Sequence, residues 1–145
     1  MQLRRDGYLI STDPARLDRD AIWRFLRTTY WSPGVARDVV ERGIENSLVF
    51  GLYSADGEQA GFARVVTDYA RFAWLADVFV LEAHRGSGLG VWLVETAVGH
   101  PRLAGLRFVL ATADAHGLYE RFGFGPVDAA RLMERRGPNP ARDTD

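Results

Sequence analysis

The chain has 145 residues, of which 47% are hydrophobic and 26% charged, the balance of one ordinary globular domain. It has no Cys and all 18 of its basic residues are Arg, which excludes disulfides, thiolate nucleophiles and reactions that need a Lys. A formal charge of -1 gives no general attraction to nucleic acid, and no apolar run reaches the roughly 20 residues of a membrane helix. We therefore expect a cytoplasmic protein without nucleic-acid or membrane partners.

The three His residues give no sign of a metal site. His84, His100 and His116 are widely separated, whereas protein zinc ligands commonly come in closely spaced pairs. We expect no bound metal.

The first part of the chain predicts one strand and two helices. Residues 7–12 are typical of a strand, and residues 18–29 place Ile22, Phe25 and Leu26 on one helical face. Ser32 followed by Pro33 is a typical start of a helix, which the apolar spacing extends to Asn46.

A three-stranded antiparallel meander is predicted next. Residues 47–53 and 59–67 are strand-like runs, and the hairpin signal Asp56-Gly57 lies between them. Residues 72–81 form a third run rich in β-branched and aromatic residues.

The last part predicts a parallel unit. A glycine-rich loop leads into a helix over residues 88–98, and residues 108–112 are typical of a buried strand. A short helix capped by Asp114 and a final strand over residues 129–135 complete the pattern. The prediction is an α/β (α+β) fold with a mixed sheet, in a single domain over residues 1–135 and a flexible tail over 136–145.

The loop from Arg85 to Gly90, with the sequence Arg-Gly-Ser-Gly-Leu-Gly, lies between a strand and a helix. Glycines there let backbone N–H groups approach an anion at the positive end of the helix. The dinucleotide-binding pattern fails at Val91, and Ser87 lacks the flanking glycines of a hydrolase nucleophile. From the loop alone, a tight turn that only caps the helix is an equal alternative.

Two motifs resolve this alternative. Val78-Phe79-Val80 followed by Arg85 to Gly90 resembles motif A of the GNAT superfamily of N-acetyltransferases, and residues 115–124 resemble its motif B, Ala-x-x-Leu-Tyr followed by Gly-Phe. The resemblance spans most of residues 7–135. Glu82 stands where Pro is frequent in the family and Thr112 where Asn is frequent, departures that bear on individual loop contacts.

The resemblance implies acetyl-CoA as the ligand and central strands that splay apart, here residues 72–81 and 108–112. It implies pyrophosphate contacts to backbone N–H groups of the loop and a pantetheine arm alongside the preceding strand. The implied cofactor-binding residues are Phe79, Val80, Arg85, Gly86, Ser87, Gly88, Leu89, Gly90 and Tyr119.

Three residues are candidates for catalysis. The resemblance implies that the Val80 N–H polarises the thioester carbonyl and that Tyr119 protonates the leaving thiolate, although Tyr119 also has the spacing of a core aromatic. Asp77 is the only carboxylate in the run 72–81. It is either the base or acceptor anchor, or a structural group that accepts hydrogen bonds from backbone or Arg.

Aromatic residues are candidates for the acceptor site. Tyr30 and Trp31 lie between the first two helices, a segment that borders the acceptor pocket in this superfamily, and Trp74 can line the same wall from its strand. Packing in the core or in a dimer is the alternative for Trp31. The expected acceptor is a primary amine of a small molecule or peptide, and the expected assembly is a monomer or homodimer. A domain of the same fold that binds CoA without turnover is the competing function.

Overall fold

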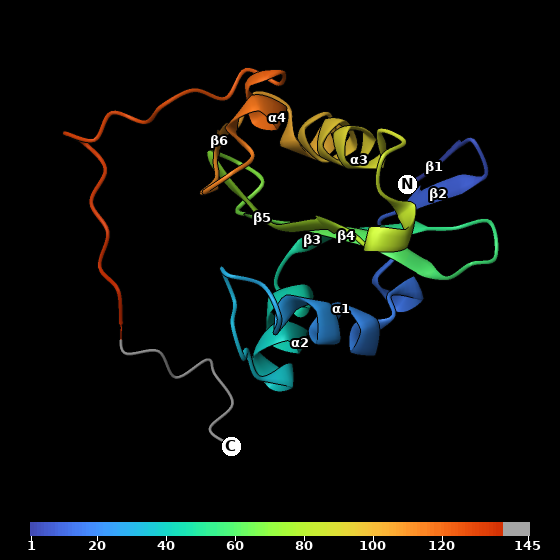
Figure 1. The fold of residues 1–145 in the computed structure, drawn as a ribbon. Coiled ribbons are helices and arrows are strands. Elements are labelled where there is room, and N and C mark those ends of the chain that lie inside the picture. The colour runs from blue at the N-terminus through green and yellow to red at the C-terminus, as the bar shows by residue number, and fades with distance from the viewer. Residues whose placement is uncertain (138–145) are drawn as a thin grey trace.

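The computed structural model describes residues 1–137. A six-stranded sheet runs through the protein in the order β1-β2-β3-β4-β5-β6, with two α-helices below it and two above it in the view of Figure 1. The strands are β1 (Gln2–Arg5), β2 (Tyr8–Ser11), β3 (Leu48–Tyr53), β4 (Gln59–Thr67), β5 (Phe72–Val80) and β6 (Arg107–Val109). The helices are α1 (Arg19–Leu26) and α2 (Arg37–Glu45) below the sheet, and α3 (Leu89–Val98) and α4 (His116–Glu120) above it. The predicted α/β (α+β) mixed sheet is thereby confirmed.

The N-terminal strand is half of a hairpin. Residues 7–12 were expected to form one strand, and β2 occupies that place, but β1 pairs with it antiparallel. Asp6 and Gly7 both have positive φ, of 51° and 83°, as the central residues of a tight primed turn do. The dipeptide Asp6-Gly7 is the signal for this turn, and it explains the additional strand.

The predicted helix start at Ser32-Pro33 is wrong. The side chain of Asp18 caps α1 by accepting from the N–H of Ala21, but α1 ends at Leu26 and α2 begins only at Arg37. Gly34 has a φ of 66°, which a right-handed helix does not accommodate. The Trp23 indole also donates to the carbonyl of Val35 at 3.0 Å, so residues 30–36 are held as a loop.

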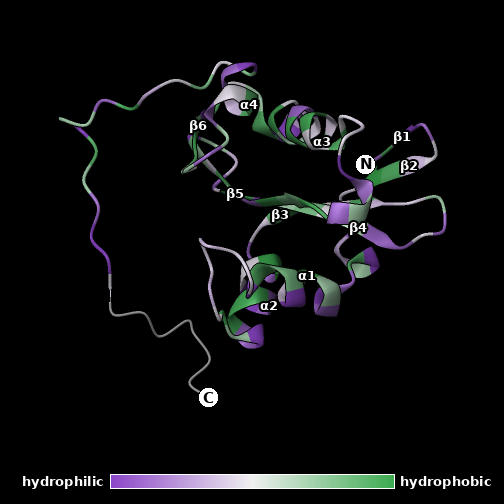
Figure 2. Ribbon diagram, viewed as in Figure 1, coloured by the Kyte–Doolittle hydropathy of each residue, from purple (hydrophilic) through white to green (hydrophobic). Residues whose placement is uncertain are grey.

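The meander agrees with the sequence, because β3, β4 and β5 pair antiparallel at the predicted places. Apolar residues on both faces of these strands form two core layers, which lie between the sheet and the helices that Figure 2 draws below and above it. Phe50 and Leu93 are fully buried in the layer under α3, and Phe62 and Ile22 in the layer over α1. The sheet is therefore a rigid platform covered on both faces.

β5 and β6 are the only parallel pair in the described sheet. Their register covers three residue pairs, from Phe72 opposite Arg107 to Trp74 opposite Val109. Beyond these pairs the two strands separate. This confirms the predicted splay, although β6 is shorter than the predicted strand over 108–112. A cleft opens where the two strands part.

The predicted final strand over residues 129–135 is wrong. A turn occupies residues 129–131, and every residue from 125 to 137 is exposed. A strand needs a paired neighbour, and no described strand follows β6 in this sheet. Most of the predicted tail, residues 138–145, lies outside the described residues.

Tyr53 provides a test of the core. Its hydroxyl is buried without a hydrogen-bond partner in the part of the chain that the structure describes, and burial raises its pKa to about 12. We expect Tyr53→Phe to leave the free energy of unfolding at pH 7 unchanged or to raise it by about 1 kcal/mol, because an unsatisfied polar group is removed.

The same substitution should change the alkaline limb of stability. Because the folded-state pKa of Tyr53 lies above the ordinary tyrosine value of about 10, the wild type loses stability as pH rises from about 10 towards 12. Tyr53→Phe should lack this contribution. Urea unfolding at pH 7 and pH 11 measures both effects, and a loss above about 1 kcal/mol at pH 7 would show that the hydroxyl stabilises the fold.

Candidate active site

A β-bulge in β5 shapes the cleft. Phe62 pairs with Phe79 but Arg64 pairs with Ala76, so β5 has one more residue than β4 over this stretch. The bulge contains Asp77, a non-glycine residue with a φ of 53°. Such backbone strain persists only where surrounding contacts hold it, and it is common at functional sites.

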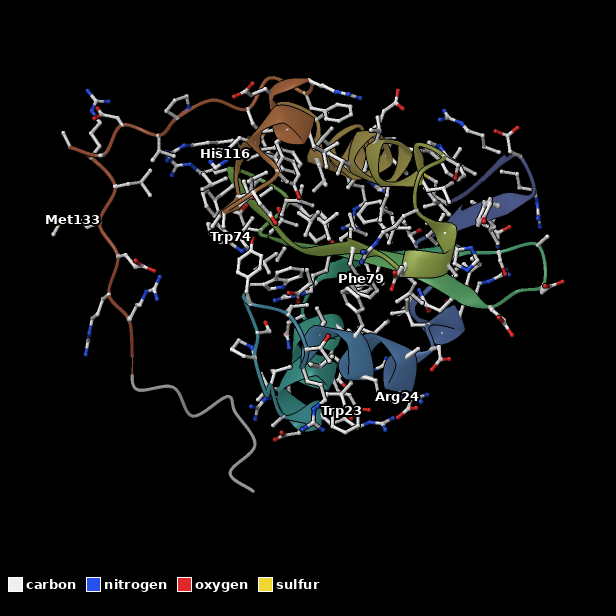
Figure 3. All side chains as sticks on the ribbon, viewed as in Figure 1. Trp23, Arg24, Trp74, Phe79, His116 and Met133 are labelled. Carbon is white, nitrogen blue, oxygen red and sulfur yellow. The ribbon has the colours of Figure 1, made fainter. Side chains whose placement is uncertain are left out.

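The cleft between the separated strands has a volume of about 730 Å³. Most of its walls come from three segments that are distant in sequence: β5, the chain after β6, and the loop after α1. The predicted acceptor residues Tyr30, Trp31 and Trp74 all line it, together with Asp77. Figure 3 shows Trp74 at the end of the sheet where β5 lies beside β6, above the loop that follows α1.

Both oxygens of Asp77 are engaged. Oδ2 accepts from Arg64 Nε at 2.6 Å, and Oδ1 accepts from Trp31 Nε1 at 3.0 Å. The side chains of Arg64 and Asp77 are only 23% and 13% exposed, and Arg64 also donates to the Ser47 hydroxyl. Of the two roles considered for Asp77, these contacts match the structural one.

Tyr30 joins the loop to the opposite wall of the cleft. Its hydroxyl accepts from the N–H of Ala113 at 3.1 Å and lies 3.5 Å from Asp114 Oδ1. The rings of Tyr30 and Trp31 meet edge to face, with centroids 5.1 Å apart. The cleft therefore carries an exposed aromatic wall next to a carboxylate, a combination that suits an amine.

A second cavity of about 270 Å³, called the groove from here on, lies over the glycine-rich loop. Gly86 and Gly88 have φ of 92° and 79°, and Gly88 is the N-cap of α3, with no side chain that caps the helix. An added Cβ at either glycine meets no described atom within 4 Å. Free N–H groups at a helix start with open space before them fit a phosphate group.

Side chains support the loop around this groove. Arg85 Nε donates to the carbonyl of Val80 at 2.8 Å, and His84 Nδ1 lies 2.8 Å from the Tyr8 hydroxyl. Leu81 donates to the carbonyl of Ala60 at 2.8 Å, so by the alternation of an antiparallel ladder the N–H of Val80 faces away from β4. Val80 itself lines the groove.

The two cavities share three lining residues, Val78, Ala115 and Tyr119. Tyr119 is half-buried, and burial, with smaller effects from Tyr30 and Asp114, raises the pKa of its hydroxyl above the ordinary value. The phenol therefore remains a proton donor at neutral pH. A proton donor therefore lies where the groove meets the cleft.

The predicted cofactor residues divide into three groups. The groove is lined by Val80, Arg85, Gly86, Gly88, Leu89, Gly90 and Tyr119. Phe79 lines it too, but its ring is stacked on Phe25 in the core with centroids 4.2 Å apart, on the α1 side of the sheet in Figure 3. Ser87 is exposed and lies outside the lining.

Sequence reasoning missed Arg64, Val78, His84 and Asp114. Arg64 carried a usable signal, because it is the only charged residue inside β4, next to a strand that contains the lone carboxylate Asp77. Val78 stands inside motif A but was not given a role there, and His84 had no signal, since only the assembled fold shows that it borders a cavity.

Comparison with known proteins identifies the class. The model of the Acetyltransferase (GNAT) family matches residues 16–124, which is most of the chain. The chain belongs to the GNAT acetyltransferase family, as the two motifs predicted.

Individual relatives agree with this assignment. A Gibberella zeae protein named as an acetyltransferase is 33% identical, and the match covers 79% of this chain and 77% of that protein. A crystal structure from Xanthomonas campestris, described as a GNAT family member, is 46% identical, with a TM-score of 0.88 over 95% of this chain and 99% of its own. Glucosamine-6-phosphate N-acetyltransferase from Arabidopsis thaliana shares the fold, at 18% identity, with a TM-score of 0.64 over 90% of this chain and 99% of its own.

Residues 1–137 show neither a membrane-spanning helix nor a metal-binding cluster. None of the helices there is both long and apolar enough to cross a bilayer. The same residues contain no group of three or more His, Cys, Asp or Glu side chains able to hold a metal ion.

Proposed function

We propose that this GNAT family member transfers an acetyl group from acetyl-CoA to a primary amine of a small molecule or peptide by direct attack. The carrying observation is the junction at Val78, Ala115 and Tyr119, where a groove built on the glycine-rich loop meets an aromatic cleft. Donor and acceptor sites that share a wall suit a reaction in which both reactants are held together.

The groove fits the donor. Gly86 and Gly88 present open backbone at the N-terminus of α3, where N–H groups and the helix dipole favour phosphate. Arg85 adds a positive charge beside them, and its bond to the Val80 carbonyl ties the loop to β5. Acetyl-CoA supplies the activated acyl group, a thioester.

The end of β5 and Tyr119 provide polar groups for the reaction. The Val80 N–H is our candidate for stabilising the charge that develops on the carbonyl oxygen. The Tyr119 hydroxyl is our candidate for protonating the departing sulfur, while the attacking amine nitrogen releases its proton to solvent in the open cleft. Its raised pKa keeps that proton in place until it is needed.

We assign Asp77 a positioning role. Charge-assisted bonds from Arg64 and Trp31 occupy both of its oxygens, so it holds the aromatic wall of the cleft in place instead of receiving the proton of the amine. The strained backbone of the bulge is held by the same contacts.

Asp77→Asn tests this role. The amide NH₂ of the new Asn would face an N–H donor, either Arg64 Nε or Trp31 Nε1. The ion pair with Arg64 would also be lost. We expect a loss of about 2 kcal/mol in the free energy of unfolding, a higher KM for the acceptor and an unchanged affinity for acetyl-CoA. Denaturant unfolding, steady-state kinetics and calorimetry give the three readouts.

Asp20→Asn is the matched control, because Asp20 pairs with Arg37 on the surface, where both side chains are over 40% exposed. It should cost less than about 1 kcal/mol and leave the KM alone. An Asp77→Asn protein with wild-type stability and KM but a shifted pH–rate profile would instead identify Asp77 as the base.

The competing function is a domain that binds CoA without turnover. Both functions predict that acetyl-CoA raises the melting temperature, because it binds only the folded state. Only the transferase predicts release of CoA thiol that depends on an amine. Absence of binding at millimolar acetyl-CoA in calorimetry would reject both.

A further inference from the structure

Within the described part of the chain, the charged residues that line the acceptor cleft leave one carboxylate without a partner of opposite charge. Arg64 and Asp77 neutralise each other in a partly buried ion pair at 2.6 Å. Arg136 is paired with Glu134 at 3.0 Å, and both of these side chains are largely exposed. The remaining charged residue is Asp114, with which no described Arg or His forms an ion pair. The cleft therefore carries an uncompensated negative charge.

The backbone around Asp114 is held in place beside a tyrosine ring. The Tyr30 hydroxyl accepts from the N–H of Ala113 at 3.1 Å and lies 3.5 Å from Asp114 Oδ1. The N–H of Ala115 donates to the Thr112 hydroxyl at 3.1 Å. Asp114 itself is exposed, so a cation in the cleft can reach its carboxylate without displacing a protein cation.

Three aromatic side chains line the same cleft, and they are called the aromatic wall here: Tyr30, Trp31 and Trp74. The rings of Tyr30 and Trp31 are almost perpendicular, at 81° with centroids 5.1 Å apart. The bond from the Trp31 indole to Asp77, at 3.0 Å, fixes that ring, and Trp74 belongs to β5, at the end of the sheet beside β6 (Figure 3). Aromatic rings set at an angle around a space, next to a carboxylate, are typical of a site for an ammonium group.

This cation site does not suit the nitrogen that attacks the thioester. A nearby carboxylate and aromatic faces favour the protonated form of an amine, whereas the attacking nitrogen needs a free electron pair. The reacting nitrogen belongs instead at the junction of the two cavities, beside Tyr119. The acceptor therefore needs a second amino group, which remains charged.

We propose that the acceptor is a diamine or polyamine, bound through a remote ammonium group to Asp114 and the aromatic wall while a neutral primary amine attacks at Tyr119. An alkylammonium has a pKa near ~10.4, so the remote group is charged at neutral pH. This assignment rests on the acetyl transfer proposed above. In that transfer a C–N bond forms as the C–S bond breaks, the nitrogen releases its proton to solvent, and Tyr119 protonates the sulfur and regains a proton from solvent.

The state of the arginines argues against an anionic acceptor. A carboxylate or phosphate beside the reacting amine would need a free cation in the cleft. Arg64 donates through Nε to Asp77 and through Nη1 to Ser47, and Arg136 is bonded to Glu134. Amino acids with a free α-carboxylate should therefore be poorer acceptors than the amines that lack it.

Matched amines test the proposal on the wild-type protein. Putrescine carries two amino groups, pentylamine has a similar length with only one, and ornithine is putrescine with an added carboxylate. Calorimetry with the CoA-bound protein should give a dissociation constant for putrescine at least about tenfold below those of the other two, the size of effect expected of one favourable cation site. The kcat/KM values should follow the same order.

Equal affinities for putrescine and pentylamine would overturn the cation site, and ornithine that binds as tightly as putrescine would overturn the exclusion of anionic acceptors. Phenethylamine is included because its ring could stack on the aromatic wall. If it binds more tightly than putrescine, the wall recognises an arene and the proposal is wrong.

Asp114→Asn tests the carboxylate. It should raise the KM and the dissociation constant for putrescine at least about tenfold and leave both values for pentylamine unchanged, because pentylamine has no remote charge. Asp56→Asn is the matched control, since it removes the same charge from an exposed turn away from both cavities. If Asp114→Asn slows pentylamine as much as putrescine, Asp114 acts on the reacting amine and the anchoring role is overturned.

The binding measurements separate this proposal from the proposed reaction. If no amine is acetylated, the transfer fails, and the calorimetric comparison of putrescine with pentylamine still decides whether the cation site exists. If pentylamine is bound and acetylated as well as putrescine, the transfer stands and the diamine assignment is overturned.

Discussion

Gly88→Val should weaken acetyl-CoA binding by at least about 100-fold, close to 3 kcal/mol. Gly88 has a φ of 79° and begins α3 at the floor of the groove. A branched side chain is strained at this φ, and it would project into the space that the phosphate needs in order to reach backbone N–H groups. Isothermal titration calorimetry measures the loss.

Gly57→Val separates this effect from backbone strain. Gly57 has a φ of 82° in the β3–β4 turn, away from both cavities, and an added Cβ there also meets no described atom within 4 Å. It should lose a similar amount of stability while binding acetyl-CoA as the wild type does. A folded Gly88→Val protein with unchanged affinity would place the donor elsewhere.

Tyr119→Phe should lower kcat by roughly 10- to 1,000-fold, the range expected when a general acid is lost and water can replace it in part. The ring remains, so its edge-to-face contact with Phe124, at 5.9 Å between centroids, should survive. Affinity for acetyl-CoA should change little. Because the pKa of Tyr119 is raised, the alkaline limb that it contributes to the wild-type profile should lie above the ordinary tyrosine value.

Tyr69→Phe is the control for loss of a phenol. Tyr69 is exposed, its ring stacks under Arg102 at 3.8 Å, and it borders neither cavity. Wild-type kcat is expected for this variant. Should Tyr119→Phe also turn over at the wild-type rate, with chemistry limiting, Tyr119 would be a core aromatic and not the acid.

Local signals explain what was predictable in the fold. The meander was found because strand periodicity and the Asp56-Gly57 turn lie within short windows of sequence. The helix start at Ser32-Pro33 failed because Gly34 and the bond from Trp23 hold a loop there. The strand over residues 129–135 failed because strand formation depends on a neighbour that local propensity does not supply.

The site residues that could be predicted are likewise those with a local signal in the sequence. The glycine-rich loop and Tyr119 were predicted because each belongs to a contiguous motif, and the structure places both at the cavities. The contact of Trp31 with Asp77 joins residues 46 apart in sequence, and the bulge that presents Asp77 arises from pairing with β4. The splay was expected only through the resemblance of the two motifs, and the positive φ of Asp77 leaves no mark in the local sequence.

The most direct test of the proposed reaction is an acceptor-panel assay with acetyl-CoA. Amino acids, polyamines, aminoglycosides and peptides with free N-termini are each incubated with the protein, while CoA thiol release and the mass of the amine are followed. The account predicts that at least one primary amine stimulates thiol release with an equal gain of acetyl groups, and that Tyr119→Phe slows both. Tight binding of acetyl-CoA without amine-dependent thiol release across the panel would contradict it and favour a CoA-binding domain without turnover.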